Sequence, residues 1–149
     1  FGVGFMDTIH IKPKSSLRVS LDEKGRLKFV PISDLESKNK MCRITSKATV
    51  KGGKVKLGFS DGRSMLSDKK EYAVGDSLLL EIPSQKVLGH FPLTKGNTVF
   101  LLSGRHTSIV CSVESLEGDI IRCRHGKDTL ETLKKFAFVV GKDKPVVTL

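Results

Sequence analysis

The sequence is poor in cysteine, and the cysteines that it has are scattered. Cys42, Cys111 and Cys123 are odd in number and far apart, and they form no CxxC pair. This pattern implies no disulfide framework and suits a reducing compartment such as the cytosol. No apolar run approaches the roughly 18 residues of a membrane-spanning helix, so we expect no membrane partner. The first residues, FGVGFMDTIHIKPK, lack the features of a signal peptide, and because they begin with Phe1 we expect a fragment or a processed product.

Catalytic motifs are missing as well. The chain has no G-x-S-x-G, H-E-x-x-H or G-x-x-x-x-G-K-[ST] pattern. A zinc or nucleophilic-cysteine enzyme is the least favoured alternative. Of its possible ligands Cys111, Cys123, His106 and His125, only Cys123 and His125 are close in sequence, and Arg124 between them would oppose a cation. Strand alternation instead makes both cysteines small core residues. The sequence therefore predicts no enzyme, no metal, no cofactor and no small-molecule substrate.

What the chain has in excess is positive charge. Its formal net charge is +10 and its pI is about 9.7, which favours a phosphate-rich partner or an acidic surface. From residue 37 to residue 60 there are seven basic residues and no acidic one. The charge is therefore concentrated in one segment.

That segment, residues 41–59 (MCRITSKATVKGGKVKLGF), predicts a β-hairpin with a two-residue loop at Gly52-Gly53. The loop sets a register in which Lys51 lies opposite Lys54. Alternation then predicts an inward face of Cys42, Ile44, Ala48, Val50, Val55, Leu57 and Phe59. It predicts an outward face of Arg43, Thr45, Lys47, Thr49, Lys51, Lys54 and Lys56. Like charges on neighbouring strand positions are destabilising, so polyanion binding is favoured over a solvated lysine edge that blocks aggregation.

The rest of the chain predicts short strands separated by turns. Pro13-Lys14 breaks the chain before a hairpin over residues 16–32, in which Leu27 and Phe29 share a face. Residues 33–36 (SDLE) fit a capping box and predict one helical turn. Further strands are predicted at residues 64–66, 77–82, 85–91, 98–102, 108–116, 120–124 and 136–140. Their regular spacing predicts small β-barrels, with a boundary at residues 92–97.

Other cations occupy predicted loops and exposed strand faces. Arg105-His106 lies in a loop, Arg122 and Arg124 share a strand face, and Lys142 and Lys144 lie in GKDKP. For each of these alone, a solvated surface charge is the open alternative. With one tyrosine, no tryptophan and most phenylalanines at inward positions, base stacking is disfavoured. Contacts with the phosphates and shape of folded RNA are favoured. The candidate RNA-binding residues are Arg43, Lys47, Lys51, Lys54, Lys56, Arg63, Arg105, His106, Arg122, Arg124, Lys142 and Lys144.

Several segments resemble known motifs. GNTVFLLSGRHTSIVCSV resembles the KOW motif of nucleic-acid-associated SH3-like barrels. Taken in order, GFMDTI, DEKGRL, ATVKGGKVKL, DGRSMLSD, VGDSLLLEIP, LTKGNTVFLLSGRH and FVVGKDKP resemble the small-subunit ribosomal protein four family of the archaeal and eukaryotic "e" type.

This resemblance implies an all-β fold with a central antiparallel β-barrel-like domain followed by a KOW-type SH3-like barrel. It implies the remnant of an S4-like RNA-binding domain at residues 1–11, a central basic domain at 12–94 and a KOW domain at 95–149. The implied role is a structural constituent of the small ribosomal subunit in the cytoplasm. Its implied partners are rRNA and neighbouring ribosomal proteins. The chain departs from the family at Ser108 and Cys111, where the pattern has glycines, so we expect a differently shaped loop there.

One alternative keeps the KOW resemblance but changes the function. A transcription elongation or antitermination module would use the KOW domain to touch RNA polymerase or nascent RNA. Such a module predicts a dedicated α/β polymerase-binding domain, whereas residues 1–94 read as a basic β unit. Co-purification with RNA polymerase rather than with small subunits would favour this alternative.

Overall fold

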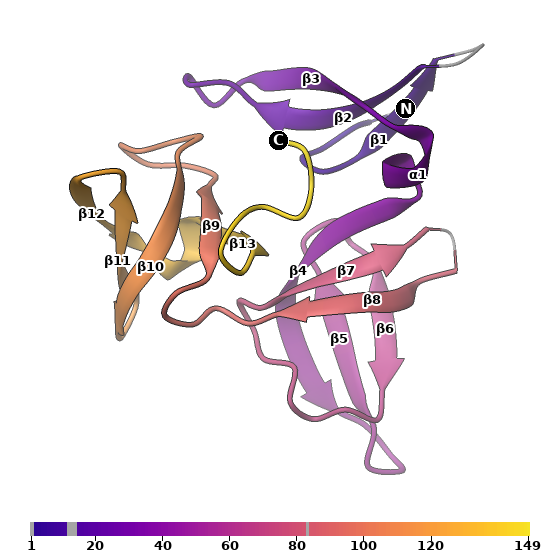
Figure 1. Ribbon diagram of the computed structural model, residues 1–149. Coiled ribbons are helices and arrows are strands. Elements are labelled where there is room, and N and C mark those ends of the chain that lie inside the picture. Colours follow the sequence, from indigo (N-terminus) through magenta and orange to yellow (C-terminus); the bar gives the residue numbers. More distant parts are fainter. Residues whose placement is uncertain (1, 12–14, 83) are drawn as a thin grey trace.

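The computed structural model describes residues 2–11, 15–82 and 84–149, and its strands form three antiparallel sheets (Figure 1). The first sheet has the order β1-β2-β3, with β1 at Thr8–Ile11, β2 at Ser15–Leu21 and β3 at Leu27–Ile32. The hairpin predicted over residues 16–32 is confirmed. The predicted break at Pro13-Lys14 lies outside the described residues, as does Pro83.

A single helical turn links the first sheet to the second. Helix α1, at Asp34–Ser37, begins after the N-cap Ser33, whose side chain accepts a hydrogen bond from the backbone N–H of Glu36. This is one half of the predicted capping box. The Glu36 side chain does not complete it, because its carboxylate binds Arg18 and Thr148 instead.

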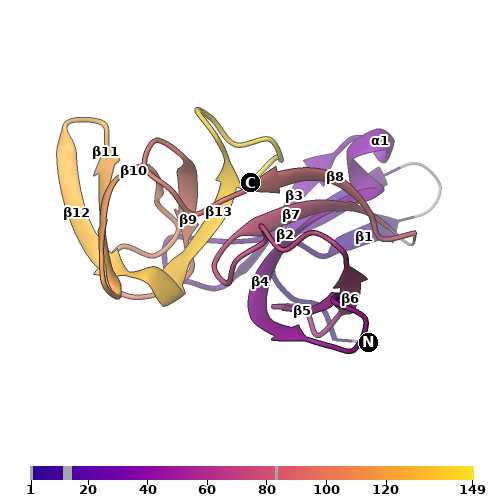
Figure 2. The same cartoon turned by 90° about the horizontal axis from the view of Figure 1, so that it is seen from below.

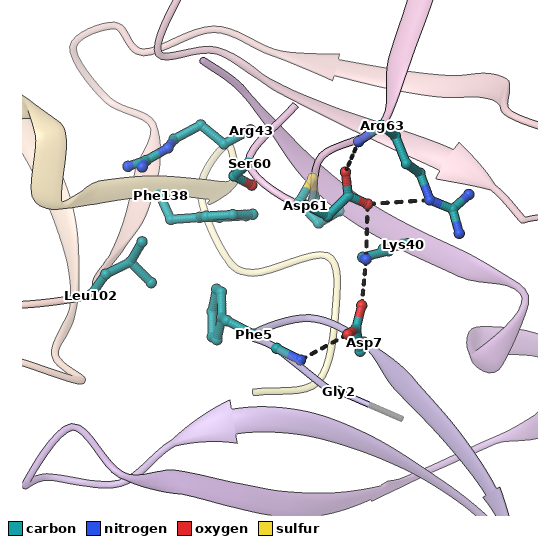
Figure 3. Close-up of a pocket in the computed structure, with 12 residues that line it drawn as sticks. Gly2, Phe5, Asp7, Lys40, Arg43, Ser60, Asp61, Arg63, Leu102 and Phe138 are labelled. Carbon is teal, nitrogen blue, oxygen red and sulfur yellow. Dashed lines mark hydrogen bonds and ion pairs between the residues drawn. The ribbon is translucent and has the colours of Figure 1, made fainter. Parts of the chain in front are cut away.

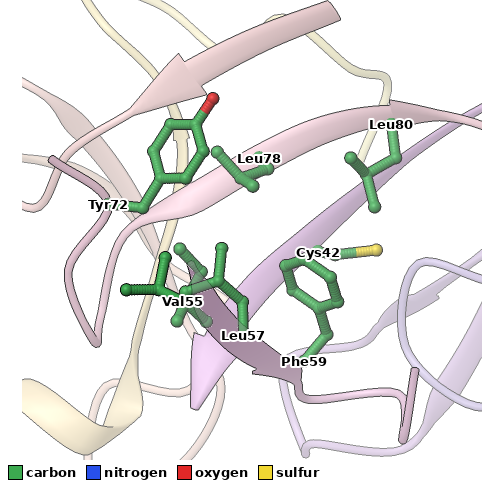
Figure 4. Close-up of a cluster of buried hydrophobic side chains, with 8 residues drawn as sticks. Cys42, Val55, Leu57, Phe59, Tyr72, Leu78 and Leu80 are labelled. Atoms are coloured by element: carbon green, nitrogen blue, oxygen red, sulfur yellow. The ribbon is translucent and has the colours of Figure 1, made fainter. Parts of the chain in front are cut away.

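The second sheet has the order β6-β5-β4-β7-β8. Its strands are β4 (Asn39–Thr49), β5 (Val55–Phe59), β6 (Ser64–Ser67), β7 (Ser77–Glu81) and β8 (Lys86–Phe91). The sheet curls around a core of Cys42, Ile44, Val55, Leu57, Phe59, Tyr72, Leu78 and Leu80 (Figure 4).

The third sheet has the order β12-β11-β10-β9-β13. Its strands are β9 (Thr98–Leu101), β10 (Val110–Glu117), β11 (Ile120–His125), β12 (Asp128–Leu133) and β13 (Ala137–Gly141), with a 3₁₀ turn at Lys134–Phe136. Cys111 and Cys123 are buried in its core, as strand alternation predicts. Seen from below, this sheet forms a lobe separate from the other two (Figure 2).

A shared core joins the lobes. Phe100 of β9 and Phe138 of β13 point away from the core of their own sheet and pack with Met41 of β4. Phe5 stacks on Phe100 with ring centroids 5.1 Å apart and meets Phe138 edge-on at the same distance. Strands β9 and β13 are thus buried on both faces, which explains why their sequences are nearly continuous runs of apolar residues.

The predicted all-β fold is confirmed: apart from the turn α1, the regular structure of the described residues consists of antiparallel strands and one 3₁₀ turn. Strands β1 and β12 were not predicted. Strand β12 lies at an edge of its sheet, and its residues are exposed or only partly buried. Its sequence, DTLETL, is therefore mostly polar and shows only a weak alternation of apolar and polar residues. Phe29 is also an exception to the expected inward phenylalanines, since it is 52% exposed.

The predicted register of the basic hairpin is wrong by one residue. The backbone N–H of Val50 donates to the carbonyl of Lys54, so the loop has three residues, 51–53, rather than two. Gly52 and Gly53 both have positive φ, of 83° and 74°, as such a loop requires. Lys47 therefore lies opposite Leu57, and Thr49 opposite Val55.

A bulge between Ile44 and Ser46 then reverses the alternation of β4. Before the bulge, Cys42 and Ile44 are buried as predicted. After it, Ala48 and Val50 turn to the outer face, and Lys47 shares the inner face with Leu57. The outer face is crowded here: a Cβ on Gly58 would lie 2.3 Å from Oγ of Ser46, so glycine is required opposite Ser46.

Candidate nucleic-acid interface

The far end of the β4–β5 hairpin carries four of the predicted cations. Lys51 is in the loop, Lys54 lies just before β5, and Lys56 extends from the outer face of β5; all three are exposed. Lys47 is also exposed but lies on the inner face, where its ammonium donates to the carbonyl of Lys70 at 2.6 Å. The structure therefore keeps these lysines at one end of the molecule but divides them between two faces.

The contact with Lys70 brings a second segment to the hairpin. Residues 68–71 lie beside it and add Lys69 and Lys70, both exposed, to the cation cluster. The sequence shows these two residues only as the adjacent pair Lys69-Lys70, outside the predicted hairpin. We call Lys47, Lys51, Lys54, Lys56, Lys69 and Lys70 the lysine cluster.

Few carboxylates oppose this cluster. Lys54 lies 3.9 Å from Asp68, and both side chains are largely exposed, so the pair is weak. Among the ion pairs of the described residues, none includes Lys47, Lys51 or Lys56. Most of the charge of the lysine cluster is thus available to an anionic partner.

Arg43 has a different environment from the lysines. Its Nη1 donates to the carbonyl oxygens of Lys135 and Ala137, at 2.8 and 3.1 Å, and so ties β4 to the third sheet. Burial of the guanidinium lowers the pKa of Arg43. The structure places this residue in the junction between two sheets and apart from the lysine cluster.

Arg63 lies at the other end of β5 and belongs to a chain of ion pairs. Its Nε is 3.3 Å from Asp61, which also accepts from Lys40 at 2.9 Å; Lys40 in turn binds Asp7 (Figure 3). Burial alone would raise the pKa of Asp61, but hydrogen bonds from Lys40 and the Arg63 backbone outweigh it and lower that pKa. The charges of this chain of ion pairs therefore neutralise one another within the protein.

The same residues line a pocket of about 640 Å³. Its other walls include Phe5, Leu102 and Phe138, while Arg43 and Arg63 point in opposite directions (Figure 3). The Asp7 and Asp61 carboxylates of this pocket already accept from internal donors, so they have little capacity left to accept a hydrogen bond from a ligand.

Arg105 and His106 lie in the loop between β9 and β10, which Figure 1 places at the opposite end of the molecule from the hairpin loop. Ser108 has φ 67°, so it keeps the left-handed backbone that a glycine would adopt. Its hydroxyl donates to the carbonyl of Asp22 and its N–H to Leu101. Cys111 is a buried residue of β10 and lies outside the loop.

The strand cations of the third sheet are paired. Arg122 lies 2.8 Å from Glu131, and Arg124 lies 2.6 Å from Glu114. Lys142 and Lys144 are exposed in the turn after β13. The predicted residues therefore fall into separate groups, of which the hairpin lysines form the largest.

The described part of the chain carries neither a membrane-spanning helix nor a metal-binding cluster. No helix there is long and apolar enough to cross a membrane. No group of three or more His, Cys, Asp or Glu residues there is arranged to hold a metal ion.

Fold and charge together define a basic, antiparallel β-sheet protein built from small lobes with a cluster of lysines at one end. Comparison with known proteins gives the family. The profile of the family described as "Ribosomal family S4e" matches residues 14–87. The small ribosomal subunit protein eS4 of Methanothermobacter thermautotrophicus is 38% identical over all of this chain, and that of Methanopyrus kandleri is 37% identical.

A solved structure agrees with these sequences. The crystal structure of the 30S ribosomal protein S4e from Thermoplasma acidophilum matches 94% of this chain with a TM-score of 0.84 and 27% identity. The chain belongs to the ribosomal S4e family. It spans 64% of the length of the Methanothermobacter protein and 73% of the solved chain.

Proposed function

We propose that this protein is a structural constituent of the small ribosomal subunit in the cytoplasm, where it binds rRNA and contacts neighbouring ribosomal proteins. Membership of the S4e family and the names of its relatives support the ribosomal role. We also propose the division into an S4-like remnant at residues 1–11, a central basic domain at 12–94 and a KOW domain at 95–149.

The observation that carries rRNA binding is the lysine cluster. Lys51, Lys54 and Lys56 extend from a rigid hairpin whose other face is fixed by Val55 and Leu57 in the core. A rigid scaffold holds the ammonium groups at fixed spacing, so phosphates can replace counterions without ordering the protein first. Such contacts position RNA by its backbone and do not read base sequence.

The remaining candidates contribute to different degrees. Arg105, His106, Lys142 and Lys144 supply a second, smaller set of exposed groups on the third sheet. Arg122 and Arg124 are each paired through one guanidinium nitrogen, with Glu131 and Glu114, so these acids offset part of the charge that the arginines offer to RNA. Arg43 and Arg63 act mainly through the protein's own structure, because their guanidinium groups are bound to internal acceptors.

A salt titration tests the mechanism. With Lys47, Lys51, Lys54 and Lys56 on four phosphates, log K for an rRNA fragment falls with log salt at a slope of about −2.8 to −3.6. The triple variant Lys51→Glu/Lys54→Glu/Lys56→Glu should bind more weakly and lower the magnitude of this slope by at least about 2.

The control has the same change in net charge away from the hairpin: Lys24→Glu/Lys86→Glu/Lys127→Glu, three exposed lysines on separate turns and strands. If both triple variants lose affinity equally, binding depends only on net charge and the cluster is not the site. Sedimentation of the full-length protein with RNA polymerase rather than with small subunits would favour the transcription alternative.

A further inference from the structure

Another pocket lies on the outer surface of the third sheet. Its volume is about 290 Å³, and its walls come from three places: the loop between β9 and β10, the paired strands β11 and β12, and the 3₁₀ turn at Lys134–Phe136. Segments far apart in the sequence thus meet around one small space. We call it the loop pocket; it is lined by Gly104, Arg105, His106, Ile120, Glu131, Thr132, Leu133 and Phe136.

One wall of the loop pocket is apolar and open to solvent. Ile120 lies opposite Leu133, so both side chains point to the same face of the sheet, away from the core that holds Ile121. They are 46% and 37% exposed. Two aliphatic side chains are therefore available to a ligand.

Phe136 adds an aromatic ring to this wall. The strand predicted at residues 136–140 would include Phe136, but the residue lies in the turn before β13 and belongs to none of the three hydrophobic clusters of the described residues. Gly104 lies against its ring, since a Cβ on this glycine would be 3.4 Å from two ring carbons. The ring is thus positioned by its neighbours but lies outside the core.

Cations border the apolar wall. Arg105 lines the pocket and is exposed. Lys135 holds its ammonium over the Phe136 ring, 5.2 Å from the ring centroid, and is also exposed. Neither cation takes part in an ion pair of the described residues. The acid among the lining residues, Glu131, is already paired with Arg122 at 2.8 Å.

This combination selects the kind of occupant. An aromatic and aliphatic wall favours a flat, uncharged group, and cations without carboxylate partners favour an anion beside it. An unpaired nucleotide of RNA supplies both, because its base has two flat faces and its phosphates are negative. A protein segment, from a neighbour or from the part of the relatives' length that this chain does not span, would have to carry an apolar side chain and an acid at the same spacing.

We propose that the loop pocket holds the base of an unpaired rRNA nucleotide, with Arg105 and Lys135 binding the flanking phosphates. This inference rests on the proposed function, since the RNA is taken from the small subunit. It adds a contact of a different kind from that of the lysine cluster. The lysines position the RNA backbone, whereas the loop pocket requires a base that is free to leave its helix.

Photo-crosslinking identifies the nucleotide. A photoreactive phenylalanine analogue replaces Phe136 in the full-length protein expressed in cells, and small subunits are purified and irradiated. We expect a crosslink to one unpaired rRNA nucleotide, mapped as a stop of reverse transcription. A protein that does not sediment with small subunits overturns the proposed function as well. A protein that sediments there, but crosslinks to protein, to its own chain, to paired rRNA or to nothing, overturns the loop pocket alone.

An abasic nucleotide separates a base contact from a phosphate contact. In an rRNA fragment, the crosslinked nucleotide is replaced with one that keeps its phosphates but has no base. Binding of the full-length protein should weaken about 5- to 150-fold, with an unchanged salt slope. Phe136→Ala should lose affinity for the unaltered RNA in the same way and show little further loss on the abasic RNA, because one interaction cannot be lost twice.

Substitutions at exposed side chains repeat this comparison without changing the turn. Ile120→Ser should weaken binding to the unaltered RNA more than to the abasic RNA. The matched control is Leu88→Ser on β8, where the side chain is 45% exposed, and it should bind both RNAs like the unaltered protein. Arg105→Ala should lower the magnitude of the salt slope by about 0.7. Equal effects of Ile120→Ser and Leu88→Ser, or equal losses on the two RNAs, would overturn the loop pocket and leave the lysine cluster in place.

Discussion

The fully buried guanidinium of Arg18 in β2 donates to the carboxylate of Glu36 in α1, with Nη1 and Oε1 2.5 Å apart. The Nη2 atom of Arg18 donates to the carbonyls of Glu36 and Asn39. The Glu36 carboxylate also accepts from the backbone and hydroxyl of Thr148. This pair therefore joins the first sheet, the start of β4 and the chain after β13.

Removal of the Glu36 carboxylate should be strongly destabilising. Glu36→Ala leaves the Arg18 charge buried without its counter-ion, so we expect a loss of about 3 kcal/mol in the free energy of unfolding, measured by urea denaturation. Glu71→Ala, at an exposed acid outside the ion pairs of the described residues, is the control and should change stability by less than about 0.5 kcal/mol. Similar losses for both would contradict a specific role of the pair.

Stability should fall on acidification. Burial would raise the pKa of Glu36, but hydrogen bonds from Thr148 and Arg18 outweigh it and lower that pKa below its usual 4.5. A lowered pKa means that the stabilisation is present above the unfolded pKa and is lost as pH falls through the folded one. Urea denaturation at pH 7 and at steps below pH 4.5 should show this decline, and Glu36→Gln should flatten it. Parallel curves for the two proteins would refute the linkage.

Arg43 and Lys51 should separate stability from RNA binding. Arg43→Ala removes the donor to Lys135 and Ala137, so we expect a loss of about 2 kcal/mol in the free energy of unfolding with little change in the salt slope of rRNA binding. Lys51→Ala should leave stability unchanged and lower the magnitude of that slope by about 0.7 to 0.9. If Arg43→Ala instead lowered the salt slope and left the free energy of unfolding unchanged, Arg43 would belong to the RNA interface.

Ser108 should tolerate glycine better than alanine. Ser108→Ala loses the hydroxyl bond to Asp22 and keeps a side chain in the left-handed region, so we expect a loss of about 1 kcal/mol. Ser108→Gly loses the same bond but relieves the backbone strain, and its net effect should be near zero. Thermal unfolding of both variants measures the difference, and a more harmful glycine would show that φ is not strained here.

Much of the architecture follows from local sequence signals. Alternating apolar residues and Gly or Asp-Gly turns predict most strands, because these signals act within a few residues. Ser33 marks the start of α1 for the same reason. The lysines of the hairpin are visible as a run without acids, so the most cationic end of the protein could be found before its structure was known.

The register of that hairpin could not be predicted from local sequence signals. Gly52-Gly53 permits loops of two or three residues, and the choice depends on how Ile44 and Phe59 fit the core, with a bulge at the intervening position. Likewise, the sequence shows Arg43 as a cation like its neighbours. Only the approach of the third sheet, more than 90 residues away in sequence, turns it into an internal hydrogen-bond donor.

The sequence by itself determined the β-rich class, the family resemblance and the concentration of lysines, because turn chemistry, motif order and charge are properties of neighbouring residues. Tertiary structure alone decided which cations remain available and which face of the first sheet is exposed. Those outcomes depend on contacts between distant segments, such as Arg18 with Glu36 and Thr148, whose geometry no local pattern encodes. The buried polar side chains of β2, Ser16, Arg18 and Ser20, are the clearest case, since alternation shows two faces and only packing chooses between them.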